Sequence, residues 1–436
     1  MARSRLVVGV AVAGILLAAC SGRGRIEQPV VTDLPVAAEA ERVDLEMPSF
    51  SKPTEITNPL FPVSSQASVL MVGTVEDQAF RTEVTLLPTP RIIEWNGQRV
   101  ATLVSQYVAF LDGHLHEVAY DFYAQADDGA VWYFGEDVFN FADGAIVDTH
   151  GSWIAGADGP AGMIMPADPQ VGDVYRPENI PGLVFEEVTV TEAGRTLDGP
   201  FGPIEGGLVV SELHMDGGTE EKTFAPRYGE FYTAAGGEVE ALAMAIPTDA
   251  AEDAVPEALD ALVTEAEAAL TAASDEDWTA AAEAADAASS AWNGYDGQVP
   301  VLLEPLLAEA TAALSDAVGA EDAIATGHAA IELARLGLDL QLRHRPVAEV
   351  DLARLGLWAD ELALDAGEED EAAVDGDLFA LDYVRERVAH TLDAEQRSAM
   401  NLVLEELQEL DADGDFEAIA DTAAELRNLV EEIAAG

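Results

Sequence analysis

A segment dense in aromatic and acidic side chains, residues 120–137 (YDFYAQADDGAVWYFGED), holds the residues whose types are best suited to chemistry. Glycine-rich stretches that follow it add a tryptophan and an aspartate. Aromatic faces stack on sugar rings and carboxylates bind hydroxyl groups, so one interpretation is a cleft for a cell-envelope glycan. The candidate ligand-binding residues are Trp132, Tyr133, Glu136, Asp137, Trp153 and Asp158.

The same residues fit three other interpretations. Two of the carboxylates could form a hydrolytic pair, which requires a separation of about 5–9.5 Å. Carboxylates and backbone carbonyls could instead hold Ca²⁺, which prefers oxygen ligands. The aromatic residues could also be core and cross-strand pairs, with the acids and glycines in turns. The sequence favours this structural interpretation, followed by non-catalytic binding and then catalysis, because composition does not by itself imply chemistry. The sequence contains no nucleophile elbow, phosphate loop, dinucleotide fingerprint or HExxH motif, which removes the strong arguments for an enzyme.

Histidines supply a second set of candidates. His114 and His116 lie two residues apart at the start of an expected strand, so both point to one side, as a transition-metal pair requires. That side also carries Val118 and Phe122, so the alternative is that the histidines border the core.

Residues 327–332 (GHAAIE) resemble the GxHxxE signature of imelysin-type iron-uptake helical domains, with the spacing shifted by one residue. His328 is in register with apolar positions of the same expected helix. We therefore expect His328 to be a core histidine.

The elements that must position the aromatic segment are β-strands. Residues 53–247 are rich in Val, Thr, Tyr and Phe and are interrupted by Gly, Asp and Pro, which predicts a mostly antiparallel sheet in a barrel or sandwich. The clearest hairpin joins 115–125 to 130–134 through an Asp-Gly turn. On its first strand, one face carries Glu117, Asp121 and Tyr123, and we expect this face to be exposed to solvent.

A composition break at 248–255 separates this region from an Ala-, Leu- and Glu-rich region, 256–436, with helical periodicity. Aspartates recur about every 45 residues at expected helix starts, Asp275, Asp322, Asp370 and Asp415, which predicts four helical hairpins in a bundle or short solenoid. The fold class is therefore α+β multidomain. The expected helices are 256–273, 275–292, 302–319, 321–343, 347–366, 370–391, 393–410 and 415–434.

Basic side chains in the helical region are few and are mostly arginine. Unpaired charges close to a core are costly, so we expect interhelical pairs with the aspartates of the same helices, such as Asp339 and Asp351. An anion or peptide site is the alternative. The basic residues are Arg335, Arg343, His344, Arg345, Arg354, Arg385, Arg387 and His390.

The overall charge limits the partners. There are 82 acidic and 21 basic residues, a formal net charge of −61, and the only lysines are Lys52 and Lys222. Nucleic acid is excluded as a partner, because phosphate binding requires a basic surface. Dispersed acids with few lysines are typical of salt-adapted (halophilic) proteins, and cation binding by specific clusters is the alternative.

The N-terminal sequence predicts where the protein is located in the cell. Arg3 and Arg5 precede an uncharged apolar segment, residues 6–19, which is shorter than the roughly 20 residues needed to span a bilayer. It ends in Leu-Ala-Ala-Cys and resembles a bacterial lipobox. The resemblance implies a signal peptide over 1–19 and acylation of Cys20, for example with palmitate. Residues 20–52 would then be a tether, and the membrane would be a partner through this anchor on the extracytoplasmic face.

The order of motifs in the β region carries a further resemblance. A YAQ strand, VWYFGED, Gly-Ser-Trp and VGDVYR over roughly 55–247 resemble a family of uncharacterised secreted bacterial proteins with YAQD, VWYFGED, GSW and VGD.YR motifs. The chain departs from that pattern at Ala126, where the family has aspartate. The resemblance implies export and no particular activity. Taken together, the sequence predicts a lipid-anchored envelope protein that binds a ligand or a protein partner without catalysis.

Overall fold

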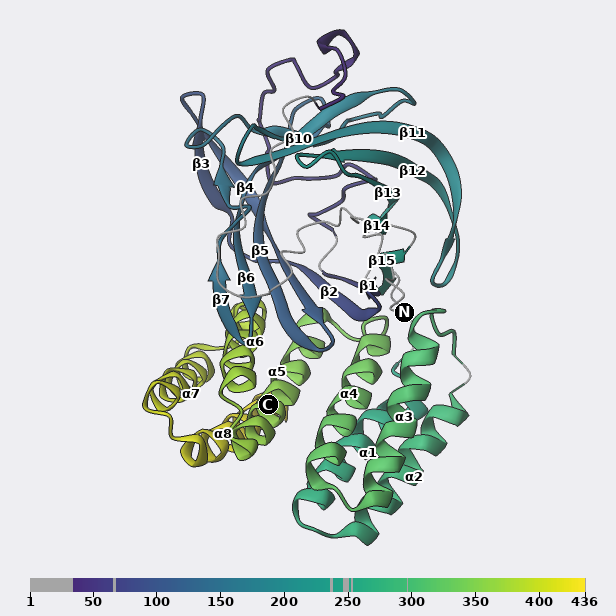
Figure 1. The fold of residues 1–436 in the computed structure, drawn as a ribbon, viewed down its shortest axis with the longest axis vertical. Coiled ribbons are helices and arrows are strands. Elements are labelled where there is room, and N and C mark those ends of the chain that lie inside the picture. The colour runs from purple at the N-terminus through teal and green to yellow at the C-terminus, as the bar shows by residue number, and fades with distance from the viewer. Residues whose placement is uncertain are drawn as a thin grey trace, which may run out of the picture.

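The structure is a computed structural model that describes residues 34–65, 68–235, 238–245, 251, 254–295 and 297–435. The predicted signal peptide and Cys20 lie outside the described residues. A curled antiparallel sheet forms one end of the molecule and helices form the other (Figure 1). This arrangement confirms the α+β prediction.

In the part of the chain that the structure describes, the sheet contains fifteen strands, and every pairing between them is antiparallel. Its hydrogen-bonded order is β10-β11-β12-β13-β14-β15-β1-β2-β4-β5-β6-β7, with β3 beside β4 and with β8 and β9 beside β6. The strands are β1 (Ser68–Val75), β2 (Gln78–Leu86), β3 (Arg91–Trp95), β4 (Gln98–Leu111), β5 (His114–Gln125), β6 (Val131–Ala142), β7 (Ala145–Asp148), β8 (Trp153–Ile154), β9 (Gly162–Met165), β10 (Val174–Ile180), β11 (Val184–Gly199), β12 (Gly202–His214), β13 (Thr219–Ala225), β14 (Gly229–Ala235) and β15 (Glu238–Ala245).

The path of this sheet has two ends among the described strands, β10 and β7. The long strands β11 and β12 arch over its concave side (Figure 1). Before the first strand come a short 3-10 helix (Glu39–Glu41) and a segment that packs on the sheet. The Val43 amide donates to the Val174 carbonyl (2.9 Å), and the Ser51 amide donates to Asp127 (2.7 Å). The packed body therefore begins before residue 53.

The predicted hairpin is present as β5 and β6. Gly129 adopts a left-handed backbone (φ +99°) in its turn, and the Asp128 carboxylate accepts from the Ala130 amide (3.0 Å). The Asp128 side chain and Gly129 therefore stabilise the turn between the two strands. The second strand continues to Ala142, eight residues beyond the expected end, because its later residues pair with β5 and β7.

Eight helices follow among the described residues, within a few residues of the predicted bounds. None of the described helices combines the length and hydropathy required to cross a bilayer. The helices are α1 (Glu257–Ser274), α2 (Trp278–Gly294), α3 (Leu303–Ala320), α4 (Ala323–Gln341), α5 (Val347–Glu368), α6 (Glu371–Val388), α7 (Ala394–Asp413) and α8 (Phe416–Ala435).

The helices form two four-helix units. In the first, α1 packs on α2 and α4, and α3 packs on the same two helices; α5–α8 repeat this arrangement (Figure 1). Capping aspartates recur at the same places, since Asp277 and Asp322 cap α2 and α4 while Asp370 and Asp415 cap α6 and α8, 93 residues later in each case. The helix start predicted at Asp275 is wrong by three residues: the chain reverses through Glu276, which has φ +57°, and α2 begins at Trp278.

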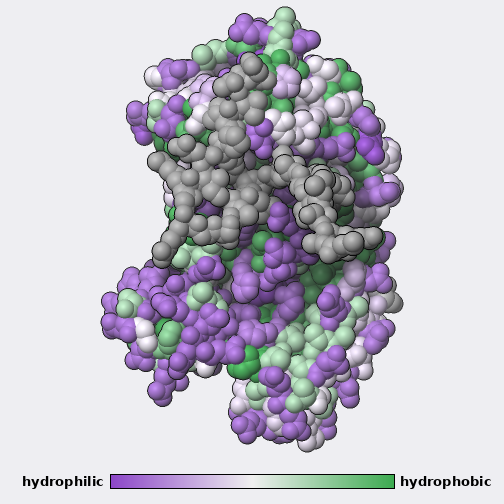
Figure 2. Space-filling model, viewed as in Figure 1, coloured by the Kyte–Doolittle hydropathy of each residue, from purple (hydrophilic) through white to green (hydrophobic). Residues whose placement is uncertain are grey.

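The two helical units support different parts of the sheet. Leu70, Val72 and Met244 of β1 and β15 share a core with α1–α4. Val118 and Phe110 of the central strands share a core with α5–α8, and Phe110 stacks on Trp358 (ring centroids 5.5 Å apart). Hydrophilic side chains gather over the outer surface of the α5–α8 unit (Figure 2).

A buried ionic network joins sheet to helices. Arg354 of α5 contacts Asp339 of α4 (2.6 Å) and Asp351 (3.0 Å), and Arg81 of β2 contacts Asp339 (2.8 Å). The whole network contains three arginines and three carboxylates with side chains at most 14% exposed: Arg81, Arg354, Arg387, Glu83, Asp339 and Asp351. The predicted interhelical pairing is confirmed for Arg354, and the network also extends into the sheet.

Candidate functional site

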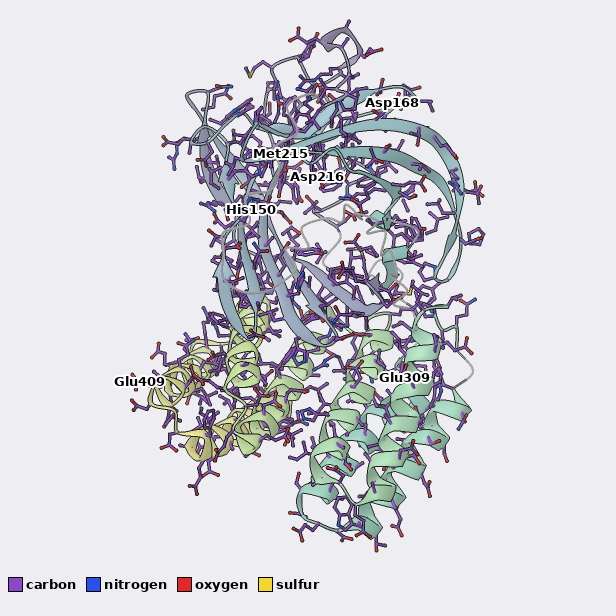
Figure 3. The ribbon with its side chains drawn as sticks, viewed as in Figure 1. His150, Asp168, Met215, Asp216, Glu309 and Glu409 are labelled. Carbon is purple, nitrogen blue, oxygen red and sulfur yellow. The ribbon has the colours of Figure 1, made fainter. Side chains whose placement is uncertain are left out.

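The concave side of the sheet encloses a cavity of about 340 Å³. Strands from both halves of the sheet line it, and three of its lining residues, His150, Met215 and Asp216, are labelled in Figure 3, away from Glu309 and Glu409 on the helices. Sites for small molecules have volumes of about 300–1,000 Å³. The cavity is therefore large enough for a small ligand.

Acidic side chains dominate the polar lining. Three basic residues, His150, His214 and Lys222, accompany them. Lys222 is one of two lysines in the chain, so one of its few compact cationic groups lies here. The ten lining acids are Glu117, Asp121, Glu136, Glu178, Glu186, Glu212, Asp216, Glu220, Glu230 and Glu240.

A bulge in the β5–β6 hairpin brings two predicted residues into this cavity. Tyr123 pairs with Tyr133 and Asp121 pairs with Glu136, so Phe134 and Gly135 together oppose a single residue of β5. The extra residue places Tyr133 and Glu136 on the same face. Gly135 has φ +114°, and a Cβ there would lie 2.0 Å from the Trp153 carbonyl oxygen, so only glycine fits.

At this side of the cavity, aromatic rings hold the acids. Tyr133 donates its hydroxyl hydrogen to Asp121 (2.6 Å), stacks on Tyr123 (ring centroids 5.0 Å apart) and meets Trp153 edge-on (5.4 Å). Trp153 donates its indole N–H to Glu178 (2.9 Å) and is 1% exposed. Both carboxylates are thereby fixed in the cavity wall.

Burial raises the pKa values of these carboxyl groups. It raises the pKa of Asp121 to about 6 and that of Glu178 to about 8. Burial, together with the neighbouring Glu178 and Asp121, raises the pKa of Glu136 well above its ordinary value. Glu136 and Glu178 lie within hydrogen-bonding reach of each other, a contact that two carboxyl groups can make only by sharing a proton. The lining of the cavity thus favours the neutral form of these two acids.

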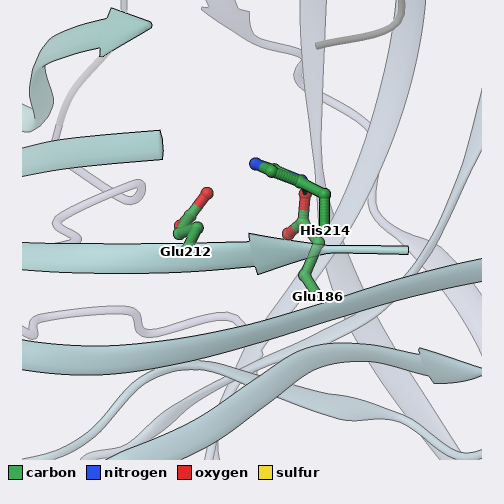
Figure 4. A group of neighbouring side chains, drawn as sticks. All are labelled: Glu186, Glu212 and His214. Atoms are coloured by element: carbon green, nitrogen blue, oxygen red, sulfur yellow. Dashed lines mark ion pairs between the residues drawn. The ribbon is translucent and has the colours of Figure 1, made fainter. Parts of the chain in front are cut away.

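The opposite wall holds a compact group of charges on β11, β12 and β13. Possible ligand atoms of Glu186, Glu212 and His214 all lie within 4.8 Å of one another (Figure 4). They come together because Glu186 and His214 are cross-strand partners, while Glu212 pairs with Glu220 on the same face. Lys222 lies 3.0 Å from Glu212.

The imidazole of His214 bridges two of these acids, lying 3.5 Å from Glu186 and 3.3 Å from Glu220. Burial alone would lower its pKa, but the two carboxylates outweigh burial and raise the pKa to about 10. Glu220 is 4% exposed, and its Oε1 has no hydrogen-bond partner among the described residues. His214 and Lys222 therefore do not pair with every carboxylate oxygen of this wall.

The other predicted ligand-binding residues lie outside the cavity. Trp132 is buried on the opposite face, paired with Ala124, and Asp137 pairs with Arg91 of β3. Asp158 accepts from the Ile154 amide (2.9 Å) in a turn. The structural interpretation therefore describes these three residues, whereas Tyr133 and Glu136 line the cavity and Trp153 supports them.

Among the described residues, no third metal-ligand atom converges with His114 and His116. His116 packs edge-on against Phe80 (6.4 Å), and burial lowers its pKa; His114 is exposed. Two groups of converging metal-ligand atoms occur among the described residues, and neither includes His114 or His116.

Sequence reasoning missed the wall formed by β11–β13. A signal was present: charged residues alternate along these strands, at Glu212 and His214 and again at Glu220 and Lys222. Alternation places each pair on one face. It did not reveal that this face lines a cavity.

Comparison with known proteins finds no match to a family model, to a curated protein or to a solved structure. Function must therefore be argued from the site itself.

Proposed function

We propose that this chain is a non-catalytic binding protein of the cell envelope whose ligand is a small organic cation. The observation that supports this most is the acid-lined cavity, to which the described residues contribute ten carboxyl groups and three basic side chains. Buried carboxylates without counter-charges are costly, so the site either retains protons or takes up a cation. An amine that entered would replace the protons and restore the charges.

Aromatic lining favours an organic cation over a bare ion. Tyr107, Tyr123 and Tyr133 contribute ring surface beside the acids. Ring faces attract ammonium groups, and apolar wall residues such as Met71 and Val84 suit the carbon skeleton. An aliphatic diamine or a quaternary ammonium compound has this combination of charge and apolar surface.

Titration calorimetry of the full-length protein at pH 7.5 tests this proposal, with putrescine, tetramethylammonium and a neutral oligosaccharide as probes. We expect saturable binding of at least one cation, weakened about tenfold or more in Glu136→Gln, which removes a carboxylate from the cavity. Asp137→Asn is the matched control. Asp137 is next to Glu136 in the chain, but its carboxylate pairs with Arg91 and faces away from the cavity. Binding of the oligosaccharide alone, or equal losses in both variants, would contradict the proposal.

A metal ion is the second candidate ligand, favoured by the convergence of Glu186, Glu212 and His214. One imidazole with two carboxylates suits a divalent transition metal better than Ca²⁺. In the same calorimeter, Zn²⁺ binding that His214→Ala removes, without amine binding, would assign the cavity to a metal.

The envelope location rests on the N-terminal sequence. Residues 6–19 and the Leu-Ala-Ala-Cys that ends at Cys20 support export and lipid attachment. We expect mass spectrometry of the membrane fraction to find Cys20 acylated at the new N-terminus. Cys20→Ser should release the protein from the membrane, whereas an unmodified thiol or recovery of the wild type from the cytosol would refute the assignment.

A further inference from the structure

A second polar group, separate from the sheet cavity, lies where α4, α5 and α6 meet. His328 comes from α4, Asp365 and Glu368 come from the last turn of α5, and Asp377 comes from α6. Helices α4 and α5 approach closely beside it, because a Cβ on Gly327 would lie 2.5 Å from a methyl carbon of Leu364. His328 is not the core residue expected from sequence, since its side chain is 37% exposed and faces carboxylates.

The imidazole is oriented as a metal ligand would be. Its Nδ1 lies 2.9 Å from Glu361 Oε1, so Nδ1–H donates to that carboxylate and leaves the lone pair on Nε2. Arg335 in turn holds Glu361 (3.5 Å). A carboxylate behind a histidine fixes the tautomer and raises the basicity of the nitrogen that faces the metal.

The distances on the other side of the ring fit an ion. His328 Nε2 lies 3.7 Å from Asp365 Oδ1 and 3.8 Å from Glu368 Oε2. Both distances are too long for hydrogen bonds. Two ligand atoms each about 2.1 Å from a tetrahedral ion lie about 3.4 Å apart. The three groups therefore surround a point that an ion could occupy after small side-chain movements.

Asp377 gives an independent indication. It is 5% exposed, and its Oδ2 has no hydrogen-bond partner among the described residues. It lies within hydrogen-bonding reach of Asp365, although two carboxylates can form that bond only by sharing a proton. A buried carboxylate oxygen without a partner is costly, and a cation bound beside it would lower that cost.

The group is also accessible. Glu368 is about half exposed and borders an open hollow whose other lining residues are almost all acidic. Such a surface concentrates cations and directs them inward. The other lining residues are Asp143, Glu369, Asp370, Glu371, Ala372 and Asp375.

We propose that His328, Asp365 and Glu368 form a binding site for a divalent first-row transition metal ion, with Glu361 as the residue that orients the histidine and Asp377 as the buried acid beside Asp365. One imidazole and two carboxylates suit Zn²⁺, Fe²⁺ or Mn²⁺. The bound ion links α4 to α5 and places positive charge close to the buried Asp377 of α6. This site is independent of the ligand proposed for the sheet cavity.

Cobalt substitution tests the site in the full-length protein freed of metal with a chelator. We expect Co²⁺ to give the visible absorption of a coordinated ion, Zn²⁺ to displace it, and both ions to raise the melting temperature. His328→Ala should remove one bound equivalent, Asp377→Asn should weaken binding about tenfold or more, and Glu361→Gln should weaken it about 10–100-fold.

Two controls keep the result specific. His214→Ala removes the other histidine-containing group and should leave the helical equivalent intact. Asp421→Asn alters an acid of α8 outside the site and should change nothing. Circular dichroism of Asp377→Asn should match the wild type, since asparagine has the same shape. Unchanged stoichiometry and affinity in both His328→Ala and Asp377→Asn would overturn the proposal, as would loss of the cobalt signal in His214→Ala alone.

Discussion

Replacing Arg354 with alanine is expected to lower the free energy of unfolding by roughly 3–5 kcal/mol, the cost of breaking a buried ionic network from one side. Arg354 is 3% exposed and contacts Asp339 and Asp351, which are themselves buried. Removing the guanidinium leaves two carboxylates close together in a site with little water. Chemical denaturation at fixed salt concentration measures the change.

Arg345→Ala is the matched control. Arg345 also contacts an aspartate at 2.8 Å, but both side chains are more than one third exposed, so its loss should cost at most about 1 kcal/mol. Added salt should narrow the difference between wild type and Arg345→Ala but not that for Arg354→Ala, because buried pairs are screened less. Equal costs for the two substitutions would show that the network does not hold the sheet on the helices.

Glu117→Gln is expected to stabilise the protein at pH 8 by roughly 2–3 kcal/mol and to change little at pH 4.5. Burial in the cavity wall, and then the nearby Asp121, raises the pKa of Glu117 from 4.5 to about 7. The fold therefore prefers the neutral carboxyl. Its contribution to stability is complete below about pH 4.5 and is lost as the pH rises through about 7. Glutamine stays neutral throughout and avoids that loss.

Glu221→Gln is the control for the pH effect, because Glu221 is exposed on β13, on the face opposite Lys222. Melting temperatures from pH 4.5 to pH 8.5 should show a shallower decline for Glu117→Gln than for the wild type or Glu221→Gln. Parallel profiles for all three proteins would mean that Glu117 is already solvated or paired when ionised.

The helical half could be predicted from sequence almost entirely. Apolar residues at a spacing of three and four place Ile419, Leu426 and Val430 on the buried face of α8, and aspartates at Asp322 and Asp370 cap the helices where expected. These signals depend on residues within one or two helical turns of each other, so they can be recognised in the sequence alone. Which helices pack together does not follow from them, and the hairpin repeat proves to be half of a four-helix unit.

The site was predictable only in part. Alternation along β5 assigns Glu117, Asp121 and Tyr123 to one polar face, and that face lines the cavity. The same rule separates Glu136 from Tyr133 on β6, since it cannot anticipate the bulge at Gly135. The density of aromatic and acidic residues therefore indicated a hairpin that lines the cavity, but it mixed cavity residues with Trp132 and Asp137, which face elsewhere.

By itself, the sequence determined the antiparallel strands, the helices with most of their caps, and the acidity, because each follows from composition or from neighbours a few residues apart. Only the tertiary structure decided which acids share a cavity and which arginines lie in the interface. Arg81 and Asp339 are 258 residues apart in the chain and 2.8 Å apart in the fold. Contacts between such distant residues are determined by strand register, sheet curvature and helix docking. All three depend on the packing of the whole chain.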